Sequence, residues 1–268
     1  TWCRSTVTVA SGAFAEVHRA VNDQGRVVSL KCFDMERGMI TLDNIANEVS
    51  TLSSYVHENI IDYITYGFIG RYCFIVMEHA AGGSLAMALD EFGRLSIGAT
   101  RNYFRDALRG LEYLHSHDVI HCDVKPHNIL IGSDGICKIA DFGSTVDVGF
   151  AESTTAEKVL ARGTPAYMSP EACRGMETKA GDIWGIGITI IELLTGKLPW
   201  DRNELRDSNR FIAKLGSIVD PSSSVVRLAP TIPEGLDAEI LELLEACLLN
   251  EPGHRPTASQ ALQYSFLR

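Results

Sequence analysis

A short polar segment carries an acid, a base and an amide at close spacing. It reads HCDVKPHNILI and places Asp123, Lys125 and Asn128 within six positions, just before an apolar run. A loop carboxylate can accept a proton from an attacking hydroxyl, and an amide oxygen five residues later can bind a divalent cation. Because Pro126 disfavours a helix, we expect an ordered loop at this place.

A second acid follows in the segment ADFGS, where Asp141 precedes Phe142 and a flexible Gly143. Asp141 and Asn128 both offer hard oxygen ligands, which suit Mg²⁺ better than zinc. The histidines near this loop, together with Cys122, form a different set of potential metal ligands. That reading is disfavoured, because no CxxC pair is present and Asp123, Lys125 and Pro126 break any plausible ligand geometry. The set is His115, His117, His121, Cys122 and His127.

A lysine and a glutamate lie further towards the N-terminus. Lys31 ends the apolar run VVSLK, and a lysine in a buried strand needs an anionic partner to offset its desolvation. Glu48 lies on an expected helix, on the side set by Val49 and Leu52, so an ion pair with Lys31 is expected. The turn VASGAFAEV around Gly12 fits either a polyphosphate-binding loop or a plain hairpin.

These residues lie in two stretches whose sequence patterns predict different secondary structure. Short β-branched runs dominate up to Met77, namely TVTVASG, AEVHRAV, RVVSLKCFD and YCFIVME, with one helix expected over residues 42–56. After the pair Gly82 and Gly83 the pattern turns helical, with an apolar stripe at Phe104, Ala107, Leu108, Leu111 and Leu114. The sequence predicts an α+β chain with a sheet part at residues 1–77, a hinge at 78–83 and a helical part at 84–268.

Composition limits the classes of partner. The chain has 268 residues, 46% hydrophobic content and a formal net charge of −10, which suits a large core but not a nucleic-acid or anionic-membrane surface. The seven cysteines are scattered singly, as is typical of reduced intracellular thiols. The apolar run IWGIGITII is too short to span a bilayer, and no signal peptide is recognisable. We expect a cytoplasmic protein without membrane insertion, and a domain of a longer chain.

Taken together, the motifs resemble those of the eukaryotic protein kinases. The segments VVSLK, HCDVKPHN, DFG, GTPAYMSPE, GDIWGIG and HRPT occur in the order and at about the spacing of that family. The resemblance implies a bilobal protein-kinase fold that uses ATP and Mg²⁺, with Mn²⁺ as a substitute. It implies that Lys31 holds the phosphates with Glu48 bracing it, and that Asp123 acts as catalytic base. Asn128 and Asp141 would bind the metal.

The resemblance also implies a set of nucleotide contacts, with Met77 as gatekeeper and the backbone of residues 78–80 facing adenine. Lys125 and Thr164 are similar to those of serine/threonine kinases, which implies a protein substrate with a Ser or Thr acceptor. The implied nucleotide-binding residues are Ala10, Ser11, Gly12, Ala13, Val17, Ser29, Lys31, Met77, Glu78, Ala80 and Leu130.

The segments HENIIDYITYG, YMSPEACRG, TGKLPW and NEPGHRPTASQAL look like the sterile-type branch, particularly its kinases that phosphorylate MAP kinase kinases. Other serine/threonine branches share many of these segments, so membership of another branch remains an alternative. Regulatory regions or partners are expected outside this chain.

Two departures from the family pattern concern activity and its control. Ala10 and Ala15 replace the outer glycines of the Gly-rich loop, and Cys122 stands where an arginine normally precedes the catalytic aspartate. That arginine meets a phosphate on the activation loop, which a neutral thiol cannot do. We therefore expect activity without a phosphate at Ser153, Thr154 or Thr155, unless Lys158 or Arg162 binds such a phosphate in place of the arginine. A pseudokinase scaffold and a small-molecule kinase remain as alternatives.

Several other residues have structural interpretations. The resemblance implies that Phe142 stacks with Leu52, Tyr63 and His121, and that Asp182 anchors the backbone of the catalytic loop. It also implies an interior ion pair between Glu171 and Arg255. His121, which follows an apolar pair, is expected to be packed rather than to act as a general base.

Overall fold

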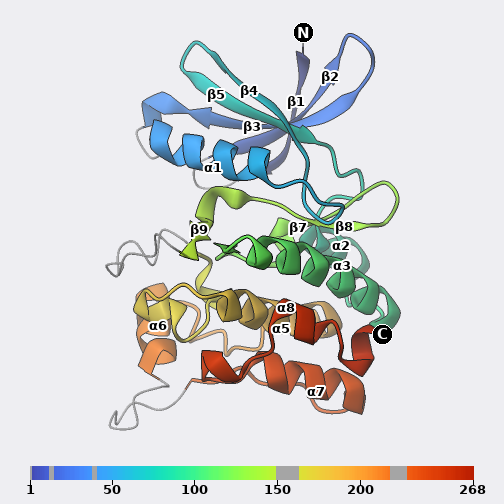
Figure 1. Cartoon of the computed structure of the whole chain (residues 1–268), viewed down its shortest axis with the longest axis vertical. Helices are drawn as coiled ribbons and strands as arrows, with labels where there is room; N and C mark the ends of the chain where they lie inside the picture. The colour runs from blue at the N-terminus through green and yellow to red at the C-terminus, as the bar shows by residue number, and fades with distance from the viewer. Residues whose placement is uncertain (1, 12–14, 38–40, 149–162, 218–227) are drawn as a thin grey trace.

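The chain divides into a sheet and a set of helices. The computed structural model describes residues 2–11, 15–37, 41–148, 163–217 and 228–268. In Figure 1 the sheet lies at one end of the molecule with helix α1 against it, and the remaining helices fill the other end. The α+β class and the two-part arrangement predicted from the sequence are confirmed.

Five antiparallel strands form the sheet, in the order β1-β2-β3-β5-β4. Their bounds are β1 Trp2–Ser11, β2 Glu16–Asn22, β3 Val27–Asp34, β4 Tyr63–Ile69 and β5 Tyr72–Glu78. Strand β4 is not among the strands predicted from the sequence, because Gly67 interrupts its pattern. Glycine avoids a close contact there, since a Cβ at Gly67 would lie 2.7 Å from the Phe74 ring of β5 and would displace it.

Alternation along β3 assigns its side chains to two faces. Val28 and Leu30 pack with Ala20 and Val76 in a small cluster on the outer face. Phe33 belongs to the main core on the opposite face. Lys31 and Ser29, at odd positions like Phe33, therefore face the helical part of the molecule.

Helix α1, Leu42–Ser54, begins at a reciprocal cap. The Thr41 hydroxyl accepts from the Asn44 N–H, and the Asn44 side chain accepts from the Thr41 N–H. Its buried face carries Ile45, Glu48 and Leu52, as the sequence predicts. A glutamate on this face needs a cation opposite it.

The rest of the chain is mostly helical. The helices are α2 Leu85–Phe92, α3 Ile97–Ser116, α5 Lys179–Thr195, α6 Ser208–Gly216, α7 Ala238–Cys247 and α8 Ala258–Ala261. The predicted stripe on α3 is fully buried. None of the helices within the described ranges combines the length and the apolar character that a bilayer span requires.

Two further pairings of strands are short, and only the second is a hairpin. Strand β6, Val119–Ile120, pairs with β9, Val146–Asp147, and β7, Ile129–Ile131, pairs with β8, Cys137–Ile139. Strands β7, β8 and β9 lie on the side of the helical part that faces the sheet (Figure 1). The loop containing Asp123 follows β6, and the turn containing Asp141 follows β8.

The paired glycines after β5 do not form a loose connection. The Gly82 N–H donates to the Ile131 carbonyl at 2.9 Å, and the Ile131 N–H donates to the Gly83 carbonyl at 2.8 Å. A Cβ at Gly82 would lie 2.8 Å from Cβ of Ile131, so glycine is required for this close approach. The segment is thus tied to β7.

Helix α5 packs against the loop that contains Asp123 and is buried on nearly all sides. Gly185 permits the close packing, because a Cβ there would lie 2.9 Å from the Val124 carbonyl oxygen. The expectation that Pro126 prevents helical structure is wrong in detail. Pro126 begins one turn of 3₁₀-helix, Pro126–Asn128, where its missing N–H costs no hydrogen bond.

Candidate active site

Lys31 links three separate segments. Its amine lies 2.6 Å from Glu48 Oε1 on α1 and 2.7 Å from Asp141 Oδ1 in the turn after β8. The Lys31–Glu48 pair predicted from the sequence is confirmed, whereas the contact with Asp141 was not predicted. One amine therefore holds together the sheet, its helix and the helical part of the chain.

The charges of these three groups are strongly coupled. Burial opposes the charge of Lys31, but the Asp141 and Glu48 carboxylates outweigh it and raise the pKa of the amine above its ordinary value. Lys31 in turn lowers the pKa of Asp141 to about 2. Burial raises the pKa of Glu48, with Lys31 acting in the opposite direction. A permanently charged amine beside an ionised Asp141 is therefore the resting arrangement.

Asp123 is held by three donors at the centre of its loop. Oδ1 accepts from the Thr164 N–H at 3.0 Å. Oδ2 accepts from the Lys125 amine at 2.6 Å and from the Asn128 amide nitrogen at 3.0 Å. The Lys125 amine also donates to the Thr164 hydroxyl at 2.6 Å. The predicted set of Asp123, Lys125, Asn128 and Thr164 is thus assembled around one carboxylate.

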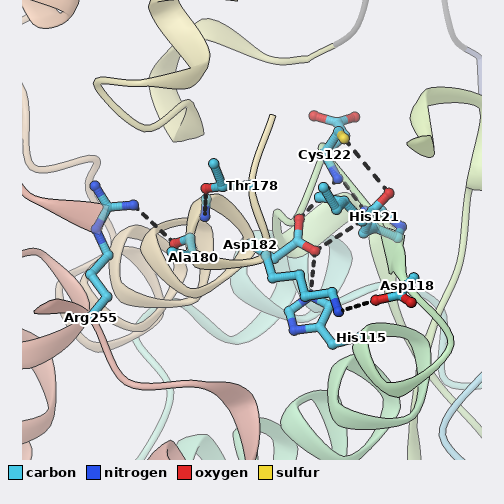
Figure 2. A network of polar contacts seen from close by, with 12 residues as sticks. His115, Asp118, His121, Cys122, Thr178, Ala180, Asp182 and Arg255 are labelled. Atoms are coloured by element: carbon cyan, nitrogen blue, oxygen red, sulfur yellow. Dashed lines mark hydrogen bonds and ion pairs between the residues drawn. The ribbon is translucent and has the colours of Figure 1, made fainter. Parts of the chain in front are cut away.

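The backbone of this loop is anchored from α5 by Asp182, as predicted (Figure 2). Its Oδ2 accepts from the His121 N–H and its Oδ1 from the Cys122 N–H, both at 2.9 Å. His115 Nε2 from α3 lies 2.7 Å from Oδ2. Cys122 has φ 68°, a left-handed conformation that is unusual for a residue with a side chain. The buried Asp182 therefore holds a strained peptide directly before Asp123.

His121 and Phe142 form the link between the two loops. His121 is fully buried; its Nδ1 accepts from the Asp123 N–H at 3.3 Å, and its Nε2 donates to the Ala140 carbonyl at 3.0 Å. The ring meets Phe142 edge-on, with centroids 5.6 Å apart. Phe142 and Leu52 both belong to the main core, and the partly buried Tyr63 packs against that core. The packed role expected for His121 is confirmed, because both nitrogens are used by the backbone.

The oxygens of Asn128 and Asp141 suit a hard cation. The Asn128 amide nitrogen donates to the Asp123 carbonyl and carboxylate, which leaves the amide oxygen to bind a ligand. The Asp141 side chain is 46% exposed, and a Cβ at Gly143 would lie 3.5 Å from its Oδ1. Among the described residues, no cluster of three or more His, Cys, Asp or Glu could hold a metal. Mg²⁺ does not need one, since it binds one or two protein oxygens plus phosphate and water.

The segment GTPAYMSPE is fixed against α5 and the loop after it. The Tyr167 hydroxyl donates to Glu192 at 2.6 Å, and the Trp200 indole N–H donates to the Ala166 carbonyl at 2.7 Å. The predicted Glu171–Arg255 pair is confirmed: both guanidinium Nη atoms contact the carboxylate, at 2.6 and 2.8 Å, with both side chains buried. Through Thr164, this segment lies against Asp123.

The residues expected at the nucleotide lie on several elements. Ala10 and Ser11 end β1, and Val17 on β2 is paired with Lys31. On β3 and β5, Ser29 lies opposite Met77, which Glu78 follows. Leu130 on β7 is only partly buried. Gly12 and Ala13 lie outside the described residues, as do the phosphorylation candidates Ser153, Thr154 and Thr155 with Lys158 and Arg162.

Comparison with known proteins identifies the family. The model of the protein kinase domain matches residues 4–267. Mitogen-activated protein kinase kinase kinase 2 of Arabidopsis thaliana is 32% identical over 97% of this chain and 40% of its own length. Its relative YODA, also of Arabidopsis thaliana, is 32% identical over 96% of this chain and 28% of its own length. Mitogen-activated protein kinase kinase kinase A of Dictyostelium discoideum is 29% identical over 96% and 27%. The chain thus spans less than half of each of these relatives, and it belongs to the protein kinase domain family.

Proposed function

We propose that this domain transfers the γ-phosphoryl group of ATP to the hydroxyl of a Ser or Thr in a protein substrate. The observation that carries the proposal is the hydrogen-bonded arrangement of Asp123, Lys125 and Thr164. The Lys31–Asp141 ion pair accompanies it. A proton acceptor and a fixed amine on one loop are what attack by a hydroxyl on a phosphoryl group requires.

Asp123 acts as the catalytic base in this proposal. Thr164 and Asn128 hold its two oxygens in place, so the carboxylate does not need to reorient when a substrate hydroxyl arrives. Lys125, at 2.6 Å from the carboxylate, remains close to the reacting oxygens and stabilises charge that develops on the transferred group. The contact between Lys125 and Thr164 places the wall of the substrate site near the base, which favours a short acceptor side chain.

Lys31 binds the α and β phosphates in the proposal, and Glu48 fixes the direction of its amine. Asn128 and Asp141 hold Mg²⁺, or Mn²⁺ in its place, through the amide oxygen and the carboxylate. When bound, the cation neutralises the phosphate charge and orients the transferred group. Lys31 already occupies Asp141 Oδ1, so Oδ2 is the oxygen that remains for the cation.

The purine would lie between β3 and Leu130, beside Met77. The N–H of Glu78 donates to the Asp62 carbonyl, and the Ala80 carbonyl accepts from the Gly83 N–H. The base would therefore use the Glu78 carbonyl and the Ala80 N–H. Ala10, Ser11 and Val17 would cover the phosphates together with Gly12 and Ala13.

We propose further that residues 1–77 form the N-lobe, 78–83 the hinge and 84–268 the C-lobe of one catalytic domain. The names of the relatives support a MAP kinase kinase as substrate, with regulatory regions outside this chain. All seven cysteines are free thiols, which supports a reducing, cytoplasmic location.

Radiolabel transfer from ATP tests the proposal. The domain should label a generic protein substrate and a catalytically inactive MAP kinase kinase on Ser or Thr, as phosphoamino-acid analysis would show. An Asp123→Asn variant supplies the matched control, since it keeps the shape of the side chain but removes the base. Labelling mainly on Tyr would contradict the acceptor preference, and equal labelling by wild type and Asp123→Asn would contradict the role of Asp123. A folded wild type that binds but does not transfer would indicate a pseudokinase.

A further inference from the structure

The base-binding region contains one polar contact that the proposed roles do not use. The Ser29 hydroxyl and His79 Nδ1 lie 3.1 Å apart and share a hydrogen bond. Ser29 occupies the alanine position of the V-A-I-K strand motif, and His79 immediately follows β5. The bond thus joins the strand above the proposed purine site to the segment that would contact the edge of the purine.

Both side chains are directed to the same place by the sheet. Ser29 precedes Lys31 by two residues, so the two share a face of β3. In the register of the sheet, Ser29 is flanked by Met77 on β5 and by Arg19 on β2. Both Ser29 and His79 are only partly buried, so a ligand at this face would meet them.

The imidazole is disposed to remain neutral. Burial lowers the pKa of His79, and the charge of Arg19 acts in the same direction. A neutral ring can accept at Nδ1 the proton of the Ser29 hydroxyl. The hydroxyl is then satisfied within the protein and does not require a partner on the ligand.

We propose that the Ser29–His79 hydrogen bond positions the base of a purine nucleoside triphosphate, by holding residues 78–80 at a fixed distance from β3. This inference rests on the proposed ATP site and adds His79 as a positioning residue for it. Without the bond, a hydroxyl and an imidazole without partners would face the purine, and the binding segment would lose a tie to the sheet.

Direct binding of a non-hydrolysable ATP analogue, followed by calorimetry, tests the proposal in the intact domain. His79→Phe keeps a ring but removes Nδ1, whereas His79→Asn keeps a polar atom near the place of Nδ1. We expect His79→Phe to raise the Kd of the analogue and the KM for ATP by about two- to tenfold, with kcat changed less than about twofold. His79→Asn should remain within about twofold of wild type.

A double-mutant cycle isolates the bond itself. Ser29→Ala should change the Kd in the wild-type background but leave it unchanged in the His79→Phe background. His254→Phe, the same substitution at an exposed histidine after α7, is the control and should leave both constants unchanged. Equal effects of His79→Phe and His79→Asn, or additive effects of Ser29→Ala and His79→Phe, would overturn the positioning role. A folded wild type that does not bind the analogue would overturn the proposed ATP site, and this inference with it.

Discussion

Replacing Asp182 by Asn changes one atom in the support of the catalytic loop. In the wild type two carboxylate oxygens accept from the His121 and Cys122 N–H groups, and His115 lies against one of them (Figure 2). An amide has only one accepting atom. Whichever way the side chain of Asp182→Asn is turned, its NH₂ group faces a backbone N–H, so at least one of the two peptide groups loses its acceptor.

The size of the stability loss follows from the Asp182 hydrogen bonds and from the backbone strain at Cys122. A buried hydrogen bond to a charged group contributes about 1.5–3 kcal/mol, and the bonds that remain become weaker once the acceptor is neutral. Cys122 is held at φ 68°, which costs about 1–2 kcal/mol for a residue with a side chain. Loss of its anchor lets the Cys122 peptide relax, which returns part of that energy. We therefore expect a net loss of about 2 kcal/mol in the free energy of unfolding, and a fall in kcat of about tenfold or more as Asp123 moves.

Urea unfolding and steady-state phosphoryl transfer measure the two effects separately. A Cys122→Gly substitution in the Asp182→Asn background should recover part of kcat, because glycine adopts a positive φ without strain. Asp237→Asn is the matched control: Asp237 is exposed and its side chain makes no capping hydrogen bond. This control should leave stability within about 0.5 kcal/mol and kcat unchanged.

The reasoning is refuted if Asp182→Asn keeps kcat within twofold of wild type, because the anchor would then be dispensable. If adding Cys122→Gly to Asp182→Asn restores none of the lost kcat, only the contribution of backbone strain is refuted. That second outcome would leave the hydrogen bonds as the whole cause of the loss.

Four further results are expected. Lys31→Met and Asp141→Asn should each lower phosphoryl transfer by orders of magnitude in single-turnover assays, and non-additively, because the two side chains form one ion pair. The stability difference between wild type and Lys31→Met should shrink as the pH falls from about 4 towards 2, since the depressed pKa of Asp141 gives stability that is lost on protonation; urea unfolding across this range measures it. Arg255→Met should lower the free energy of unfolding by about 3–5 kcal/mol in the same assay, because it leaves the Glu171 carboxylate buried without its cation. Owing to Cys122, phosphatase-treated domain should reach a kcat within about tenfold of the autophosphorylated domain, and a hundredfold gain on phosphorylation would contradict this.

The sequence predicted the parts of the site that depend on local pattern. The helical spacing of residues 42–56 placed Glu48 on the buried face of α1, and this predicted its pairing with Lys31 on the neighbouring strand. Asp123 and Asn128 share one short loop, so their meeting needed no knowledge of the fold. The Glu171–Arg255 and Asp182 contacts came from the family resemblance, because more than fifty residues separate the partners in each case.

Two contacts between distant segments were predicted neither from local pattern nor from the resemblance. The Lys31–Asp141 ion pair joins residues that are 110 positions apart, and nothing in either motif shows how the sheet sits on the helical part. The same is true of Ser29 and His79, which meet only through the register between β3 and β5. Strand β4 was missed because Gly67 is an unfavourable strand residue, although its lack of a Cβ leaves room for the Phe74 ring.

Cys122 shows how one position in the loop combines two separable functions. Its backbone N–H is bound to Asp182 and its φ is positive, and this geometry supports Asp123. In the family pattern the side chain at this position is an arginine that reads a loop phosphate, which is a separate task. The thiol removes only the second function: the Cys122 N–H still donates to Asp182 and the three donors of Asp123 are in place. Asp123 is therefore held in position without an arginine at residue 122, which is why we expect control of this domain to lie elsewhere than in loop phosphorylation.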